Sequence, residues 1–189
     1  MTQIATAFLK TTRLMPQMNK RICVFGSYKH LSEKEDIVRL GKLLAKKGFI
    51  VVSGGFGGTM EDVSKGAKSA GGKTIGVTYY KLKDRPYKKA NEYIDEEIET
   101  KDIFERIDTM MKNSDAFIVL PGGTGTLLEL AAVLEHINKG IMEQKPIIAI
   151  GNFWKTVIDR LKGEARSDLV TFVDSTEEAA EKLKLILNG

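Results

Sequence analysis

Residues 121–126, with the sequence Pro-Gly-Gly-Thr-Gly-Thr, have the composition of an anion-binding loop. The loop follows an apolar run typical of a buried strand and precedes a pattern that predicts a helix. Glycines let the backbone approach a ligand closely, and the free N–H groups and dipole at a helix start favour a negative charge. The hydroxyl groups of Thr124 and Thr126 are further donors. We therefore interpret this segment as a phosphate-binding loop; the alternative is a turn whose glycines only permit tight packing.

Two other glycine-bearing turns follow apolar runs, at Gly26-Ser27 and at residues 53–60 (Ser-Gly-Gly-Phe-Gly-Gly-Thr-Met). Two glycine-rich loops at one edge of a sheet favour a nucleotide-like ligand. Neither loop matches the dinucleotide fingerprint, because Leu128 and Met60 occupy the position of its third glycine, and no P-loop is present. The predicted ligand-binding residues are Gly26, Ser27, Gly54, Gly55, Gly58, Met60, Gly122, Gly123, Thr124, Gly125 and Thr126.

Two charged residues could carry chemistry beside these loops. Glu129 lies three residues after Thr126, which is also the spacing of a capping box, where the carboxylate would only bond the backbone at the helix start. Arg106 falls on the flank of a helical apolar stripe, and its alternative is a solvated side chain paired with Asp102 one turn earlier. Spacing alone does not decide between the alternatives for either residue.

The composition excludes several function classes. The chain has 189 residues, a net charge of +4, one cysteine and two histidines, so we predict no disulfide framework and no metal centre built from Cys or His. His30 could line the ligand site, whereas His136 is expected to be structural. The basic doublets are short and lack interleaved aromatic residues, which argues against nucleic acid as a partner. No apolar run approaches the roughly 18 residues that a membrane span needs, and a reducing cytoplasm fits best.

Short apolar runs alternate with helical patterns along the chain. Predicted strands cover residues 21–25, 49–52, 74–77, 93–94, 116–120, 146–150 and 169–173. Predicted helices cover residues 31–44, 60–70, 102–113, 126–139, 157–161 and 175–187. Solid apolar strands are buried on both faces, so the pattern predicts a Rossmann-like α/β fold: a doubly wound, mainly parallel sheet of about seven strands with helices on both faces. Such sheets bind ligands at the carboxyl ends of their strands, where the three glycine turns would lie.

The two ends of this pattern define the expected domain organisation. Residues 1–19 contain no acidic residue and show no helix or strand periodicity, so we expect a flexible N-terminal extension. Residues 20–189 are expected to form one Rossmann-like domain, because a chain of this length can bury a single hydrophobic core. A charged loop is expected at residues 81–91.

With these residues assembled, the chain resembles the LONELY GUY (LOG) family from about Lys20 to the C-terminus. Residues 121–129, Pro-Gly-Gly-Thr-Gly-Thr-Leu-Leu-Glu, match the family signature PGGxGTxxE. The segment Phe104-Glu105-Arg106, followed by Met110, is similar to the arginine-bearing helix of the family. The chain departs from the family pattern at Ile107, where a lysine commonly stands, and at Leu128, which replaces an acidic residue.

The resemblance implies an activity and a site. LOG proteins hydrolyse the N-glycosidic bond of nucleoside 5′-monophosphates, such as AMP or cytokinin nucleotides, to a free base and ribose 5-phosphate. By resemblance, Arg106 and Glu129 would be the catalytic pair and residues 122–126 would cradle the phosphate. The resemblance also implies that no cofactor is required and that the protein is a homodimer or a higher homo-oligomer. The rival interpretation is a non-catalytic protein that binds a nucleotide or carries molybdenum cofactor.

Overall fold

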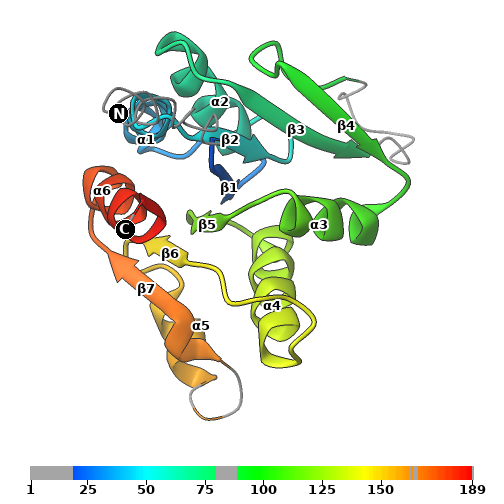
Figure 1. Ribbon diagram of the computed structural model, residues 1–189, viewed down its shortest axis with the longest axis vertical. Helices are drawn as coiled ribbons and strands as arrows, with labels where there is room; N and C mark the ends of the chain where they lie inside the picture. Colours follow the sequence, from blue (N-terminus) through cyan, green and yellow to red (C-terminus); the bar gives the residue numbers. More distant parts are fainter. Residues whose placement is uncertain (1–18, 80–88, 162, 164–165, 189) are drawn as a thin grey trace, which may run out of the picture.

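Seven parallel strands form a single sheet within the part of the chain that the structure describes. The computed structural model describes residues 19–79, 89–161, 163 and 166–188. The strands lie in the order β4-β3-β2-β1-β5-β6-β7 (Figure 1). Their bounds are β1 Arg21–Phe25, β2 Ile50–Ser53, β3 Thr74–Tyr79, β4 Glu96–Thr100, β5 Ala116–Val119, β6 Ile147–Ile150 and β7 Val170–Val173. The predicted doubly wound parallel sheet is confirmed.

Helices cover both faces of this sheet. Their bounds are α1 Lys34–Lys46, α2 Thr59–Ser69, α3 Ile103–Lys112, α4 Thr124–Asn138, α5 Lys155–Arg160 and α6 Thr176–Asn188, with a short 3-10 helix at Ser167–Leu169. Side chains of α1, α2 and α6 pack in one hydrophobic cluster, and those of α3, α4 and α5 pack in another. Successive residues of β1 alternate between the two, so Cys23 and Phe25 face one cluster while Ile22 and Val24 face the other. Burial on both faces explains why the central strands are solid apolar runs.

The direction in which the sheet grows reverses between β1 and β5. Strands β2, β3 and β4 follow β1 outward on one side, whereas β5 returns to pair with the other side of β1. The helices after these two strands pack on opposite faces, because α1 belongs to one cluster and α4 to the other. A crevice forms at such a switch point, beyond the carboxyl ends of the strands. The turns at Gly26-Ser27 and at residues 121–123 lie at this crevice.

The fourth strand differs from the prediction. Residues 93–94 were expected to form it, but β4 comprises Glu96–Thr100 and pairs with β3 at the edge of the sheet. Its sequence, Glu-Glu-Ile-Glu-Thr, is mostly exposed. Charged side chains protect an edge strand from pairing with other chains, so this strand has no apolar run by which the sequence could reveal it.

Two other expectations fall largely outside the described residues. The N-terminal extension at 1–19 overlaps them only at Asn19, and the charged loop at 81–91 only at residues 89–91. Both stay predictions. No helix among the described residues is long and apolar enough to cross a membrane.

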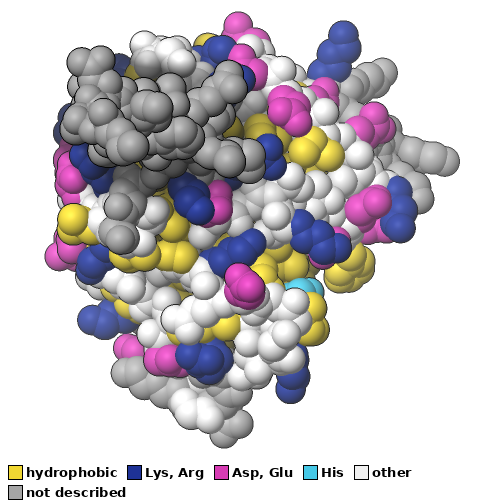
Figure 2. Space-filling model, in the orientation of Figure 1, with side chains coloured by type: hydrophobic (Ala, Val, Ile, Leu, Met, Phe, Trp, Pro, Cys, Tyr) yellow, Lys and Arg dark blue, Asp and Glu magenta, His cyan; other side chains and the backbone are white. Residues whose placement is uncertain are grey.

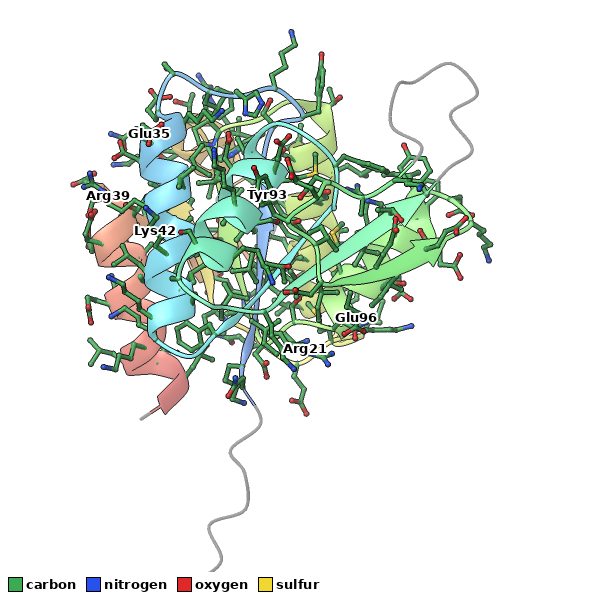
Figure 3. All side chains as sticks on the ribbon, turned by 90° about the horizontal axis from the view of Figure 1, so that it is seen from above. Arg21, Glu35, Arg39, Lys42, Tyr93 and Glu96 are labelled. Atoms are coloured by element: carbon green, nitrogen blue, oxygen red, sulfur yellow. The ribbon has the colours of Figure 1, made fainter. Side chains whose placement is uncertain are left out.

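The surface mixes charges of both signs. On the face shown in Figure 2, Lys and Arg side chains are interspersed with Asp and Glu and do not merge into one basic patch. Helix α1 shows the same arrangement locally, because Glu35, Arg39 and Lys42 are exposed, and Glu35 and Arg39 point away from the sheet in Figure 3. Its opposite face carries Ile37, Leu40 and Leu44, which are buried.

Helices α1 and α2 approach each other through two glycines. A Cβ atom added at Gly41 would lie 2.0 Å from the carbonyl oxygen of Val63, and one added at Gly66 would lie 1.9 Å from that of Val38. Both distances fall far below van der Waals contact, so the backbones touch at this crossing. The crossing orients α2, whose first turn follows the second glycine loop.

We predict that Gly66→Ala lowers the free energy of unfolding by about 2 kcal/mol or more, because the added methyl group must separate the two helices. In an unconstrained helix the same change would stabilise by about 1 kcal/mol, so the sign of the effect is informative. Urea unfolding checks it, with the exposed Lys65→Ala on the same helix as control. Equal or higher stability of Gly66→Ala would contradict the close crossing.

Candidate functional site

A cavity of about 480 Å³ lies at the switch point of the sheet. This volume is within the range of roughly 300–1,000 Å³ that small-molecule sites occupy. The predicted residues that line it are Gly26, Ser27, Met60, Arg106, Gly123, Thr124, Gly125, Thr126 and Glu129. The structure therefore brings four segments that are distant in sequence to one cavity. The predicted residues Gly54, Gly55, Gly58 and Gly122 are not among its lining residues.

Arg106 is buried in the wall of this cavity, with 6% of its surface exposed. Its Nε donates to the carbonyl oxygen of Val77 at 2.7 Å, and its Nη1 lies 3.5 Å from a carboxylate oxygen of Glu129. The alternative of a solvated arginine paired with Asp102 is therefore wrong. The Asp102 carboxylate instead caps α3 by accepting hydrogen bonds from the backbone N–H groups of residues 104 and 105.

Glu129 also points into the cavity wall and is 7% exposed. The capping-box alternative is wrong, because α4 begins at Thr124 with Gly123 as its N-cap, two residues before the predicted start. The Thr126 hydroxyl, which would have been the cap, donates to the carbonyl oxygen of Gly26 at 2.8 Å. The same spacing does act as a cap at α6, where Glu178 bonds the backbone N–H of Asp174.

Burial raises the pKa of Glu129 to about 7. Loss of water disfavours the charged carboxylate, and the nearby Arg106 guanidinium opposes the shift only in part. The carboxyl group is therefore poised to gain or lose a proton near neutral pH. Perturbed carboxylates in a cavity are typical of functional sites.

The N-terminus of α4 is left open toward the cavity. The N–H groups of its first turn have no backbone acceptor within the helix, and no side chain caps them. Of the described helices with ten or more residues, α1, α2, α3 and α6 carry acidic residues in the first turn, whereas α4 carries none. Gly123, Thr124 and Gly125 are exposed. An anionic group would find both free donors and a favourable dipole here.

The glycines outside the cavity lining make room for the side chains that form it. A Cβ atom at Gly54 would lie 1.6 Å from Nη2 of Arg106, and one at Gly122 would lie 2.2 Å from Oγ1 of Thr126. Gly55 and Gly58 adopt φ values of +73° and +69°, which other residues rarely adopt. These glycines shape the site without lining it.

Five lining residues were missed by the sequence analysis: Tyr28, Phe56, Tyr79, Ile103 and Leu128. The rings of Phe56 and Tyr79 flank Arg106, with centroids 5.6 and 5.8 Å from its Cζ. Position alone could have found Phe56, which interrupts a glycine run, whereas Tyr79 lies two residues beyond the predicted end of its strand. Aromatic faces stabilise a guanidinium and exclude water from it.

Neither histidine lies among the residues that line the cavity. Nδ1 of His30 lies 2.7 Å from a carboxylate oxygen of the buried Asp62. His136 contacts the carbonyl oxygen of Ala132 within its own helix, in agreement with a structural role. Among the described residues, no cluster of three His, Cys, Asp or Glu side chains is placed to hold a metal ion.

The sequence and the fold of this chain are similar to those of known proteins. The sequence pattern of the SLOG cluster4 family matches residues 19–180, and the chain belongs to this family. The similarity to LOG proteins is confirmed by curated relatives. The probable cytokinin riboside 5′-monophosphate phosphoribohydrolase LOGL9 of Oryza sativa subsp. japonica is 37% identical over 132 residues, which are 68% of this chain and 57% of the rice protein. The cytokinin riboside 5′-monophosphate phosphoribohydrolase LOG1 of Arabidopsis thaliana is 36% identical over 132 residues, 68% of this chain and 61% of that protein.

The chain thus spans little more than half the length of these plant relatives. Solved structures match over more of their length. The molybdenum cofactor binding protein of Rippkaea orientalis is 28% identical, with a TM-score of 0.70 over 90% of this chain and 99% of that one. The molybdenum cofactor carrier protein of Chlamydomonas reinhardtii, at 24% identity and a TM-score of 0.69, shares the fold.

The raised pKa of Glu129 predicts how stability depends on pH. The folded protein holds the Glu129 proton more tightly than the unfolded chain does, since its pKa rises from the usual 4.5 to about 7. Below about pH 4.5 the carboxyl group is protonated in both states, so its burial carries no penalty for a buried charge. The free energy of unfolding then falls as the pH rises from 4.5 through 7. Relative to Glu129→Gln, which does not titrate, we expect wild type to lose at most about 3 kcal/mol between pH 4.5 and pH 8.

Urea unfolding of both proteins at several pH values measures this difference. A difference that stays constant from pH 5 to pH 8 would show that the carboxylate is solvated in the folded state.

Proposed function

We propose that the protein hydrolyses the N-glycosidic bond of nucleoside 5′-monophosphates, releasing the free base and ribose 5-phosphate. The observation that carries this proposal is the buried Arg106–Glu129 pair, which faces the same cavity as the open N-terminus of α4. The N-terminus of α4 suits a phosphate, and the cavity wall holds the Glu129 carboxyl group, whose pKa is about 7. The names of the plant relatives point to the same reaction class.

In this proposal the phosphate binds at the first turn of α4. The backbone N–H groups there, together with the Thr124 hydroxyl, bond the anion and fix the position of the ribose. Since Gly123 and Gly125 have open space where a Cβ would stand, the phosphate can approach the backbone closely. Binding energy from this end of the nucleotide then orients the glycosidic bond in front of Glu129.

Ionised Glu129 would act on the sugar. When the bond between C1′ and the base nitrogen breaks, positive charge builds on the ribose ring. A carboxylate in a water-poor wall stabilises that charge more strongly than one in water. Water then adds at C1′, while the base leaves with the bonding electrons and takes up a proton. Arg106 holds the carboxylate in place, and its charge favours the ionised form that the reaction needs.

A second candidate is a molybdenum-cofactor carrier. The full-length match to the Rippkaea orientalis binding protein favours it, since 99% of that chain is covered. The open helix N-terminus would suit any anionic ligand, so it does not distinguish the two candidates. The two differ at Glu129, because a carrier needs no group that acts on a glycosidic bond.

We predict that Glu129→Gln abolishes turnover of AMP while leaving its binding intact. The amide keeps the shape of the side chain but carries no negative charge, so we expect kcat to fall by at least about 100-fold, or about 2.7 kcal/mol. Liquid chromatography of released adenine measures turnover, and calorimetry measures affinity for AMP and adenosine. Tighter binding of AMP than of adenosine by the variant would show that the phosphate site is preserved.

Glu178→Gln is the matched control, because Glu178 has the same spacing at a helix start but only caps α6. If both variants release adenine at the wild-type rate, the catalytic role of Glu129 fails. If wild type binds AMP and releases no adenine, the carrier candidate takes precedence.

We further propose that the protein is a homodimer through the exposed faces of α3 and α4. Phe104 is 71% exposed, and Leu127 and Leu128 are partly exposed. These helices are in contact with each other, and Leu128 also borders the cavity. A second copy would remove this apolar surface from water.

Light scattering after size-exclusion chromatography tests the dimer. We predict that Phe104→Glu yields a folded monomer, since the side chain lies outside the core of one subunit, and that its melting temperature no longer depends on protein concentration. A wild-type monomer, or a variant that remains a dimer, would contradict this interface.

A further inference from the structure

Asn91 holds the second glycine loop from outside. Its Nδ2 donates to the carbonyl oxygens of Gly55 and Phe56, at 3.1 and 2.8 Å. Its backbone N–H donates to the same Gly55 oxygen at 2.8 Å. Its Oδ1 in turn accepts from the N–H of Tyr93, which is labelled in Figure 3. The side chain therefore uses its donor side for the loop and its acceptor side for the segment that leads into β4.

The loop depends on such a contact because it has little to hold itself in place. Residues 53–58 include four glycines, which lose more conformational freedom on ordering than other residues. Within the loop, the Ser53 hydroxyl accepts from the N–H of Gly55 at 3.2 Å. The two carbonyl groups that Asn91 bonds are those of Gly55 and Phe56, whose backbone sets the direction of the Phe56 ring.

Phe56 connects the loop to Arg106. Its ring lies 5.6 Å from the guanidinium carbon and packs edge-on against Tyr79, with centroids 6.4 Å apart. Gly54, two residues earlier, leaves room only for the guanidinium, because a Cβ atom there would lie 1.6 Å from Nη2. A shift of this loop would therefore remove the aromatic cover or push against the arginine itself.

We propose that Asn91 is a positioning residue for Arg106, acting through the Gly55-Phe56 backbone and the Phe56 ring. Its consequence for catalysis rests on the proposed function, whereas its effect on Arg106 can be measured without any ligand. Asn91 does not line the cavity and belongs to none of the motifs, so no sequence pattern singles it out. Its donors fix where the guanidinium stands relative to Glu129.

The sharpest variant is Asn91→Asp, which has the same size. It keeps the acceptor for Tyr93 but replaces the amide donor with an oxygen that faces two carbonyl oxygens. Asn113→Asp is the matched control. Asn113 also donates through Nδ2 to a carbonyl oxygen, that of Thr109, and accepts through Oδ1 from Arg21, at the other end of β1 from the cavity.

The first measurement is solvent exchange of the Arg106 Nε–H by NMR in the ligand-free protein. This proton is bonded to Val77, and we expect exchange at least tenfold faster in Asn91→Asp and unchanged in Asn113→Asp. Unchanged exchange in Asn91→Asp would overturn the proposal. Faster exchange in Asn91→Asp, together with a wild-type protein that does not hydrolyse AMP, would support the positioning role and refute the proposed function alone.

The second measurement is a double-mutant cycle on kcat/KM for AMP. We expect Asn91→Asp to lower kcat/KM at least tenfold, and to lower it less than twofold further once Phe56→Ala is present, because both changes act through one ring. If Asn91→Asp instead caused a general structural defect, it would lower kcat/KM by the same factor with or without Phe56→Ala. Full additivity would therefore overturn the route through Phe56.

Discussion

The burial of Arg106 against Glu129 is the constraint on which the rest of the site depends. Taking two charged groups out of water is costly, and their attraction recovers that cost only when the geometry is close. Here the contact is 3.5 Å, and the pKa of Glu129 stays near 7 because desolvation outweighs the arginine charge. The protein thus holds a carboxylate whose ionised form is barely favoured at neutral pH. Ionisation of such a group lowers the free energy of unfolding, which favours a role in chemistry.

The loops and helices around this pair are positioned mainly by strand pairing and by glycines that let backbones approach closely. Parallel pairing of β1 with β5 sets the turns at Gly26 and Gly122 side by side, and the Thr126 hydroxyl bonds across them. Gly54 leaves space for the guanidinium, and the close approach of α1 and α2 fixes the helix that follows the same loop. The glycine loops therefore do two jobs. The loop before α4 leaves N–H groups uncapped beside the cavity, whereas the loop before α2 makes room for Arg106.

The sheet, its helices and most of the cavity lining were predictable from the sequence. Apolar runs mark buried strands and helices, and glycines mark the turns that the backbone must make between them. The edge strand β4 was not, since exposure removes the apolar signal. Spacing also could not distinguish a Glu129 that caps α4 from one that is buried in the cavity wall, because both roles are compatible with a position near the start of the helix. The observed start of α4 at Thr124 excludes the capping role. Asn91 and Tyr79 reach Arg106 or its loop only through tertiary contacts, for which no local pattern exists.

The most direct test of this account is the release of adenine from AMP by wild-type protein, followed across pH 5 to 9. A carboxylate that acts in its ionised form, with a pKa near 7, predicts that kcat/KM rises with pH through about 7 and then levels off. Release of equal amounts of adenine and ribose 5-phosphate would accompany this profile. No adenine at any pH, or a rate that falls as the pH rises through 7, would contradict the role assigned to Glu129.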